Sequence, residues 1–190
     1  MSIGRRWRSV SAVLITSWLI AGCGDDPPNK EIQQAQQAIE TARTAGAERY
    51  AADEFKSAED ALQRSEAAVA GRDYRQALND ALDARDKAQT AGRDAAERKS
   101  TMKTDVDRSL HDVALAIVDA RAKLRAAENA RRPVRLLVPV RRSIADAETQ
   151  VQDARSAFDH GDYLNAQSLL MVSRTKLDDS VRNLESFGKK

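Results

Sequence analysis

Few residues in this 190-residue chain have side chains that commonly carry chemistry: one cysteine, Cys23, and two histidines, His111 and His160. A single cysteine forms neither an internal disulfide nor a multi-cysteine metal site, and no histidine lies near Cys23 in sequence. His160 lies between Asp159 and Asp162, which could bind a metal or transfer a proton. His160 also directly precedes the Gly-Asp-Tyr turn at 161–163, and we favour the interpretation that it is an exposed turn residue. His111 lies next to an apolar stripe and is interpreted as a boundary residue.

Recognisable catalytic motifs are absent from the sequence, which has no HExxH, GxSxG, Walker loop or GxGxxG pattern. Its carboxylates alternate with basic residues instead of forming an isolated pair. We therefore expect no enzyme, no cofactor and no bound metal. An unrecognised hydrolase or metal-binding protein is the alternative, and it would need a cluster of perturbed polar residues in a cleft.

The first 22 residues have the three parts of a secretory signal peptide. Arg5, Arg6 and Arg8 precede an apolar run over 10–20, and small residues follow. The run is shorter than the roughly 20 residues of a bilayer span. We predict a cleaved signal over residues 1–22, with an uncleaved membrane anchor as the alternative.

The sequence Ile20-Ala21-Gly22-Cys23 closely resembles the lipobox of bacterial lipoproteins. The resemblance implies cleavage between Gly22 and Cys23 and acylation of the Cys23 thiol, with two or three acyl chains making a stable membrane anchor. Residues 23–30 then form a polar, Pro-rich tether. Because Gly24 and not an Asp follows the cysteine, the resemblance favours the outer membrane of the bacterial cell envelope, facing the periplasm.

The charge of the expected mature chain is nearly balanced. Removal of residues 1–22 takes three of the 31 basic residues and none of the 29 acidic ones, leaving a net charge near −1. No basic run is interleaved with aromatic residues, so we expect no nucleic-acid partner. A charged fraction of 32% with only 4% aromatic residues is typical of long helices.

Apolar residues recur at 3-4 spacing in six stripes, over 32–42, 55–69, 74–95, 106–127, 140–158 and 163–184. This period predicts an all-α, elongated antiparallel helical bundle with coiled-coil-like packing. Acids four residues before bases, such as Asp60 with Arg64 and Asp94 with Arg98, are expected to pair on exposed faces.

The helix ends are marked by small residues. Gly46, Gly71 and Gly161 are expected to be left-handed C-caps, and Asp73 and Asp162 to cap the helices that follow. Two prolines, at 133 and 139, bracket a connecting segment. Gly92 is expected to be a weak point inside one long helix from about residue 73 to 100 or beyond.

An internal repeat relates the two halves of the chain. At a constant offset of 89, nine residues of 58–87 meet identical residues, including Asp73 and Tyr74 with Asp162 and Tyr163. We infer two related helical units, over residues 31–100 and 101–190, joined through one long helix.

Residues 38–91 resemble a bacterial envelope family, the domain of unknown function 4398. The resemblance is carried by a "GA..Y" turn at Gly46, an acid-starting helix at Asp53 and a "DY..A" turn at Asp73. Members occur in small lipoproteins and ahead of OmpA-like peptidoglycan-binding domains. No such domain is expected here, so the resemblance implies location and architecture but no activity.

The segment 131–142 is explained least by helix packing. Five arginines flank and interrupt an apolar run in this segment. These arginines are Arg131, Arg132, Arg135, Arg141 and Arg142. One interpretation is a helix connection with one buried apolar side. The other is a contact site for anionic lipid headgroups, a cell-wall polymer or a protein partner.

Together these features predict a non-enzymatic periplasmic lipoprotein that acts as a scaffold or adaptor for a protein partner in the envelope. The alternative is a structural tether between membrane and peptidoglycan. The terminal lysine, Lys190, would then be joined to peptidoglycan, as in the major murein lipoprotein that the chain's lipid anchor, helices and C-terminus resemble.

Overall fold

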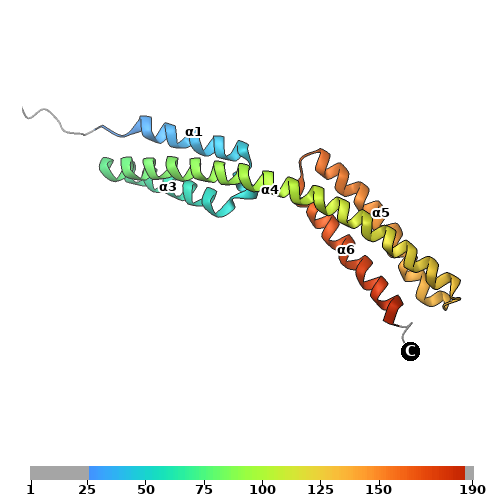
Figure 1. The fold of residues 1–190 in the computed structure, drawn as a ribbon. Helices are drawn as coiled ribbons and strands as arrows, with labels where there is room; N and C mark the ends of the chain where they lie inside the picture. Colours follow the sequence, from blue (N-terminus) through green and yellow to red (C-terminus); the bar gives the residue numbers. More distant parts are fainter. Residues whose placement is uncertain (1–25, 187–190) are drawn as a thin grey trace, which may run out of the picture.

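The computed structural model describes residues 26–186, and all the regular secondary structure in that range is helical (Figure 1). The helices are α1 (Asn29–Ala45), α2 (Ala47–Tyr50), α3 (Ala52–Ala70), α4 (Tyr74–Asn129), α5 (Val134–Asp159) and α6 (Tyr163–Ser186). The predicted all-α fold is confirmed.

Helix α4 is the common element of two three-helix units. Its first half packs against α1 and α3, and its second half packs against α5 and α6 (Figure 1). At 56 residues it is about 84 Å long, with a rise of about 1.5 Å per residue. The molecule is therefore a bent rod with Asn29 at one end and the α4–α5 turn at the other.

The first unit has a core built mainly from alanine. The fully buried face of α4 in this unit consists of Ala77, Ala81, Ala84, Ala88, Ala91 and Ala95. Small side chains let the neighbouring helices approach closely. A Cβ atom added to Gly92 would lie 3.5 Å from the Cα of Ala42 in α1. Gly92 lies within one uninterrupted helix, as predicted, and it does so at this close contact with α1.

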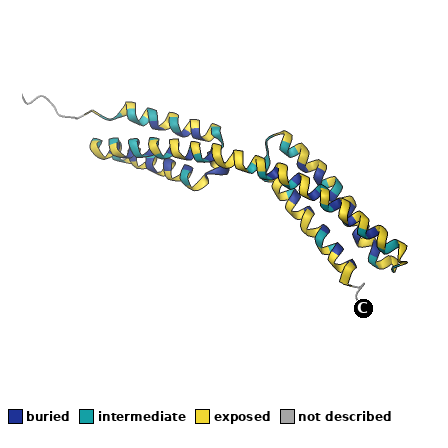
Figure 2. Ribbon diagram, viewed as in Figure 1, coloured by how far each residue is buried: buried dark blue, intermediate teal, exposed yellow. Residues whose placement is uncertain are grey.

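The second unit has a core of larger side chains. Val106, Leu110, Val113 and Ile117 of α4 pack in one cluster with residues of α5 and α6, including Leu170 and Leu177. In Figure 2 the buried positions lie where the helices face one another, and exposed positions cover the outside of the rod. The two cores meet at Met102, which packs against both.

The repeat in the sequence is visible in the turns that join the helices of each unit. The backbone N–H of Asp73 donates to the carbonyl of Ala68 at 2.9 Å, and that of Asp162 donates to Ala157 at 2.9 Å. The left-handed residue of the first turn is Arg72, with φ 59°, and its counterpart is Gly161, with φ 76°. Gly71 is right-handed with φ −80°, so its predicted left-handed role is wrong.

The expected break at Pro139 does not occur. Helix α5 begins at Val134, directly after Pro133, and continues through Pro139 in its second turn. Pro139 is the sixth residue of α5 and has no N–H to donate to the carbonyl one turn earlier, so the helix continues there with one backbone hydrogen bond fewer. Leu137 and Val140 are buried, so this segment is the beginning of a packed helix and not a connecting loop.

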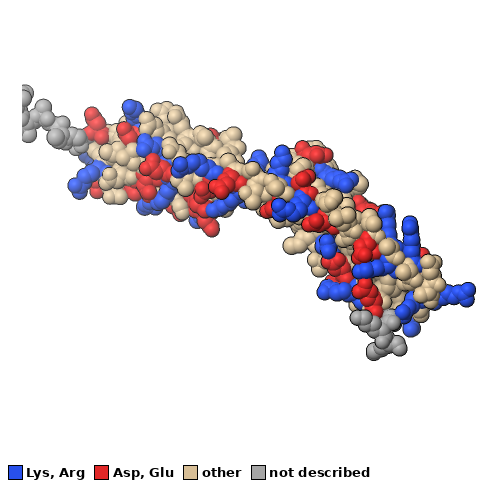
Figure 3. Space-filling model, viewed as in Figure 1, with Lys and Arg blue, Asp and Glu red and all other residues tan. Residues whose placement is uncertain are grey.

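Long-range partners change two of the expected ion pairs, those of Arg64 and Arg98. Arg64 pairs with Asp80 and Asp83 of α4 and not with Asp60. Arg98 donates to Glu54 at 2.5 Å. Spacing along one helix could not reveal these partners, because they lie on neighbouring helices. Figure 3 shows the resulting mixed charge along most of the rod.

Candidate functional site

Three predicted site residues lie outside the part of the chain that the structure describes. They are Gly22 and Cys23, at the expected cleavage and lipidation site, and Lys190, the expected point of peptidoglycan attachment. These assignments stay predictions. The described range begins three residues after Cys23, within the tether, and its first helix starts at Asn29.

Both histidines have ordinary structural surroundings. The Nδ1 atom of His160 lies 2.6 Å from the carbonyl oxygen of Ser156, one turn earlier in α5. This contact places His160 at the helix C-terminus, as expected for a turn residue. His111 is exposed on α4, in a shallow groove with Arg155 of α5. Neither ring lies in an enclosed cavity.

Residues 26–186 contain no group of three or more His, Cys, Asp or Glu side chains arranged to hold a metal ion. Within the same range no helix is long and apolar enough to cross a membrane.

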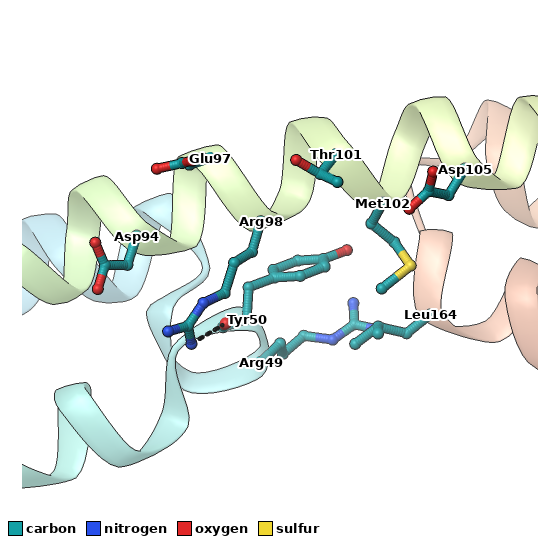
Figure 4. Close-up of a pocket in the computed structure, with 9 residues that line it drawn as sticks. All are labelled: Arg49, Tyr50, Asp94, Glu97, Arg98, Thr101, Met102, Asp105 and Leu164. Atoms are coloured by element: carbon teal, nitrogen blue, oxygen red, sulfur yellow. Dashed lines mark hydrogen bonds between the residues drawn. The ribbon is translucent and has the colours of Figure 1, made fainter.

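The junction between the two units contains one pocket, of about 500 Å³, which sequence reasoning missed (Figure 4). Tyr50, at the end of α2, is only 8% exposed and closes its floor. Its ring points along α4 toward Met102, with Leu164 of α6 opposite. The hydroxyl is buried and has no hydrogen-bond partner in the described chain, and burial raises the pKa of this phenol.

Ionic contacts surround the Tyr50 ring at the junction. Arg98 of α4 donates to the backbone carbonyl of Tyr50 at 3.0 Å and to Glu54 of α3. The hydrogen bond from Arg98 holds the pKa of Glu54 below its usual value. The pocket thus has an apolar floor and charged walls, but its arginines are engaged in structural contacts. We interpret it as the joint between the units.

One signal in the sequence could have revealed this joint. Met102 is the only large apolar side chain between the stripe that ends at Ala95 and the one that begins at Val106. Met102 continues the 3-4 spacing between Ala95 and Val106, so α4 has an apolar side chain at the position where the two cores meet.

The arginine-rich segment lies at the far end of the second unit. Arg131 is in the α4–α5 turn, with φ 52°, and Arg132 follows it in the same turn. Arg135, Arg141 and Arg142 are on the first turns of α5. Helix α5 therefore brings these residues together at one end of the rod, far from the joint.

The five arginines do not have the same surroundings. Arg141 forms an ion pair with Glu128 of α4 at 2.6 Å. Arg131, Arg135 and Arg142 are exposed. The backbone at Arg131 has the left-handed conformation seen at Arg72 and Gly161, so this turn repeats their geometry.

The first unit corresponds to a known family. Residues 30–105 match the family described as domain of unknown function (DUF4398). The chain carries a DUF4398-like domain. The match covers α1, α2, α3 and the first part of α4, and it ends one residue before Val106, where the core of the second unit begins.

The resemblance based on residues 38–91 is thus confirmed, and the DUF4398-like domain coincides with the first unit. No curated protein and no solved structure matches the chain. The family match ends at residue 105 and does not include the second unit.

Proposed function

We propose that this protein is a lipid-anchored, non-enzymatic scaffold of the bacterial cell envelope that holds a protein partner at a fixed distance from the membrane. The leader motif at Cys23 supports the lipid anchor and, through it, the envelope location. The long rod built around α4 supports the role of a spacer.

The single observation that carries this proposal is the continuity of α4. One helix of 56 residues runs through both units, which makes the rod about 84 Å long without a flexible linker. The N-terminal tether enters at Asn29, at one end, and the arginine-rich segment lies at the other end (Figure 1). A membrane anchor at Cys23 would therefore direct that segment away from the membrane.

The anchor is tested by replacing Cys23 with Ser. We expect the wild-type protein to sediment with membranes and to carry acyl chains by mass spectrometry, and the variant to be released into the soluble envelope fraction. Membrane association that is unchanged by Cys23→Ser would contradict the lipid anchor.

The scaffold role is tested in chemically cross-linked envelopes, with and without peptidoglycan digestion. Recovery of the same defined protein in both samples would support a scaffold. Recovery of the chain only after digestion, with muropeptide mass on its C-terminal peptide, would contradict it and identify a tether.

A tether to peptidoglycan is the second candidate, and one contact favours it. Lys123 near the end of α4 pairs with Glu185 at the end of α6 at 2.9 Å. Because of this contact, the C-terminal end of α6 also lies far from Asn29. Lys190 follows four residues after Ser186, and attachment there would place peptidoglycan at the distal end. Replacement of Lys190 with Arg should abolish the muropeptide mass if the tether exists.

A further inference from the structure

We propose that the distal end of the rod is a docking surface for an acidic protein segment with an apolar centre. The surface, called here the arginine tip, consists of Arg131, Val134, Arg135, Val138 and Arg142. This inference deepens the proposed scaffold role, because it names the chemistry of the partner, and it rests on that role.

The arginine tip is a single face of α5 with the turn before it. Val134, Val138 and Arg142 follow one another at intervals of four, and Arg135 is three residues before Val138, so these side chains point the same way. Leu137, Val140 and Ile144 occupy the opposite, buried side. The two valines are 66% and 51% exposed, so their apolar side chains are open to a partner.

Charge is strongly unbalanced around the arginine tip. Residues 120–145 include eight basic residues and one acidic residue, Glu128. Glu128 already pairs with Arg141 of α5. No ion pair within residues 26–186 is found for Arg131, Arg135 or Arg142. Figure 3 shows basic side chains projecting from this end of the rod. A partner would supply the missing negative charge.

The α3–α4 turn has the same backbone geometry as the α4–α5 turn but a different charge. The window 57–82, also 26 residues long, contains three basic and five acidic residues around the α3–α4 turn. The excess of arginine is therefore a property of the distal end and not a requirement of the turn.

The type of side chain points to carboxylates presented by a protein. Seven of the eight basic residues are arginines, whose planar guanidinium groups bind carboxylates through two hydrogen bonds. Arginine around an apolar centre is also the usual composition of a protein interface, where Lys is depleted.

Other polyanions suit the arginine tip less well. No aromatic side chain is present between Tyr74 and Phe158, so the tip lacks the rings that stack on nucleic-acid bases or sit in lipid headgroups. Two valines also give little apolar area for insertion into a bilayer. A bound acidic segment would cover both valines and neutralise the three arginines around them.

The test measures binding of a labelled acidic peptide helix with a leucine stripe to the purified chain by fluorescence anisotropy. The variant Arg131→Glu/Arg135→Glu/Arg142→Glu should weaken binding about tenfold or more, because three ion pairs become repulsive. The control, Arg72→Glu/Arg75→Glu/Arg93→Glu, changes the net charge equally in the first unit and should leave binding unchanged. Circular dichroism verifies that both variants fold.

Two further measurements separate the alternatives. Val134→Ser/Val138→Ser should weaken binding of the leucine-striped peptide and leave binding of oligoglutamate unchanged, since only the former has an apolar face. Vesicles of equal phosphatidylglycerol and phosphatidylcholine, and purified peptidoglycan, are tested in parallel.

The proposal is overturned if the peptide does not bind, if both triple variants weaken it equally, or if only vesicles or peptidoglycan bind. None of these measurements depends on acylation of Cys23. Failure of the arginine tip and failure of the lipid anchor are therefore observed separately.

Discussion

Arg49 of α2 and Asp162 of the α5–α6 turn are 113 residues apart in sequence, yet their side chains form an ion pair at 2.5 Å that joins the two units directly. The hydrogen bond from Arg49 holds the pKa of Asp162 below its usual value. Asp162 also directly precedes α6, where its backbone carbonyl accepts the N–H of Ala166 at 3.1 Å. The residue before α6 therefore carries a direct contact between the two units.

Replacing Asp162 with Asn should loosen the joint without unfolding α6. Asparagine is as good an N-cap as aspartate but cannot form the ion pair with Arg49. Spin labels at Gln63 and Gln152, equivalent exposed positions in the two units, should then show a broader distance distribution by pulsed electron resonance. The labelled protein carries Cys23→Ser.

The matched control is Arg121→Gln, which removes an ion pair with Glu148 inside the second unit. It should leave the distance between the labels unchanged. Equal broadening in both variants would show that the Arg49–Asp162 pair has no special role at the joint.

Acidification should loosen the same joint. The pKa values of Asp162 and Glu54 are lowered in the folded protein by Arg49 and Arg98. Lowered values mean that the stabilisation is complete above the unfolded values of about 4 and is lost as the pH falls through the folded values. Thermal unfolding of wild type and Asp162→Asn should therefore differ at pH 7, and the difference should begin to shrink as the pH falls below about 4. A constant difference between the two proteins at pH 7 and pH 3 would contradict this linkage.

Most of the fold could be predicted because helix burial follows local spacing. The six alanines of α4 from Ala77 to Ala95 and the apolar series from Val106 to Leu124 are buried as the 3-4 pattern predicts. Asp73 and Asp162, which the sequence repeat aligns, each precede a helix after a turn with the same backbone hydrogen bonds.

The features that could not be predicted depend on contacts between helices. Tyr50 and Leu164 meet at the joint only because α4 passes both. Arg98 faces both Asp94 in its own helix and Glu54 in α3, and the sequence cannot say which it prefers. The conformation of Arg72 was missed because a glycine immediately precedes it, and Gly71 was the more obvious left-handed residue.

Replacing the left-handed residue Arg72 with glycine should relieve backbone strain in the α3–α4 turn and stabilise the protein. A non-glycine residue in the left-handed region costs about 1–2 kcal/mol, so Arg72→Gly should raise the free energy of unfolding by about 1 kcal/mol. The reciprocal change, Gly161→Ala, introduces the same strain in the second unit and should lower it by a similar amount. Urea unfolding followed by circular dichroism measures both. Opposite signs support the equivalence of the two turns, whereas destabilisation by Arg72→Gly would contradict it.

The close contact at Gly92 leads to the last prediction. Alanine is favoured over glycine inside a helix by about 1 kcal/mol, and the added Cβ would meet Ala42 at an ordinary contact distance of 3.5 Å. Gly92→Ala should therefore raise the free energy of unfolding by up to about 1 kcal/mol. Gly92→Leu should lower it, because a branched side chain cannot fit against the α1 backbone without separating α1 from α4. If Gly92→Leu were as stable as Gly92→Ala in urea unfolding, α1 would not pack on α4 at this position.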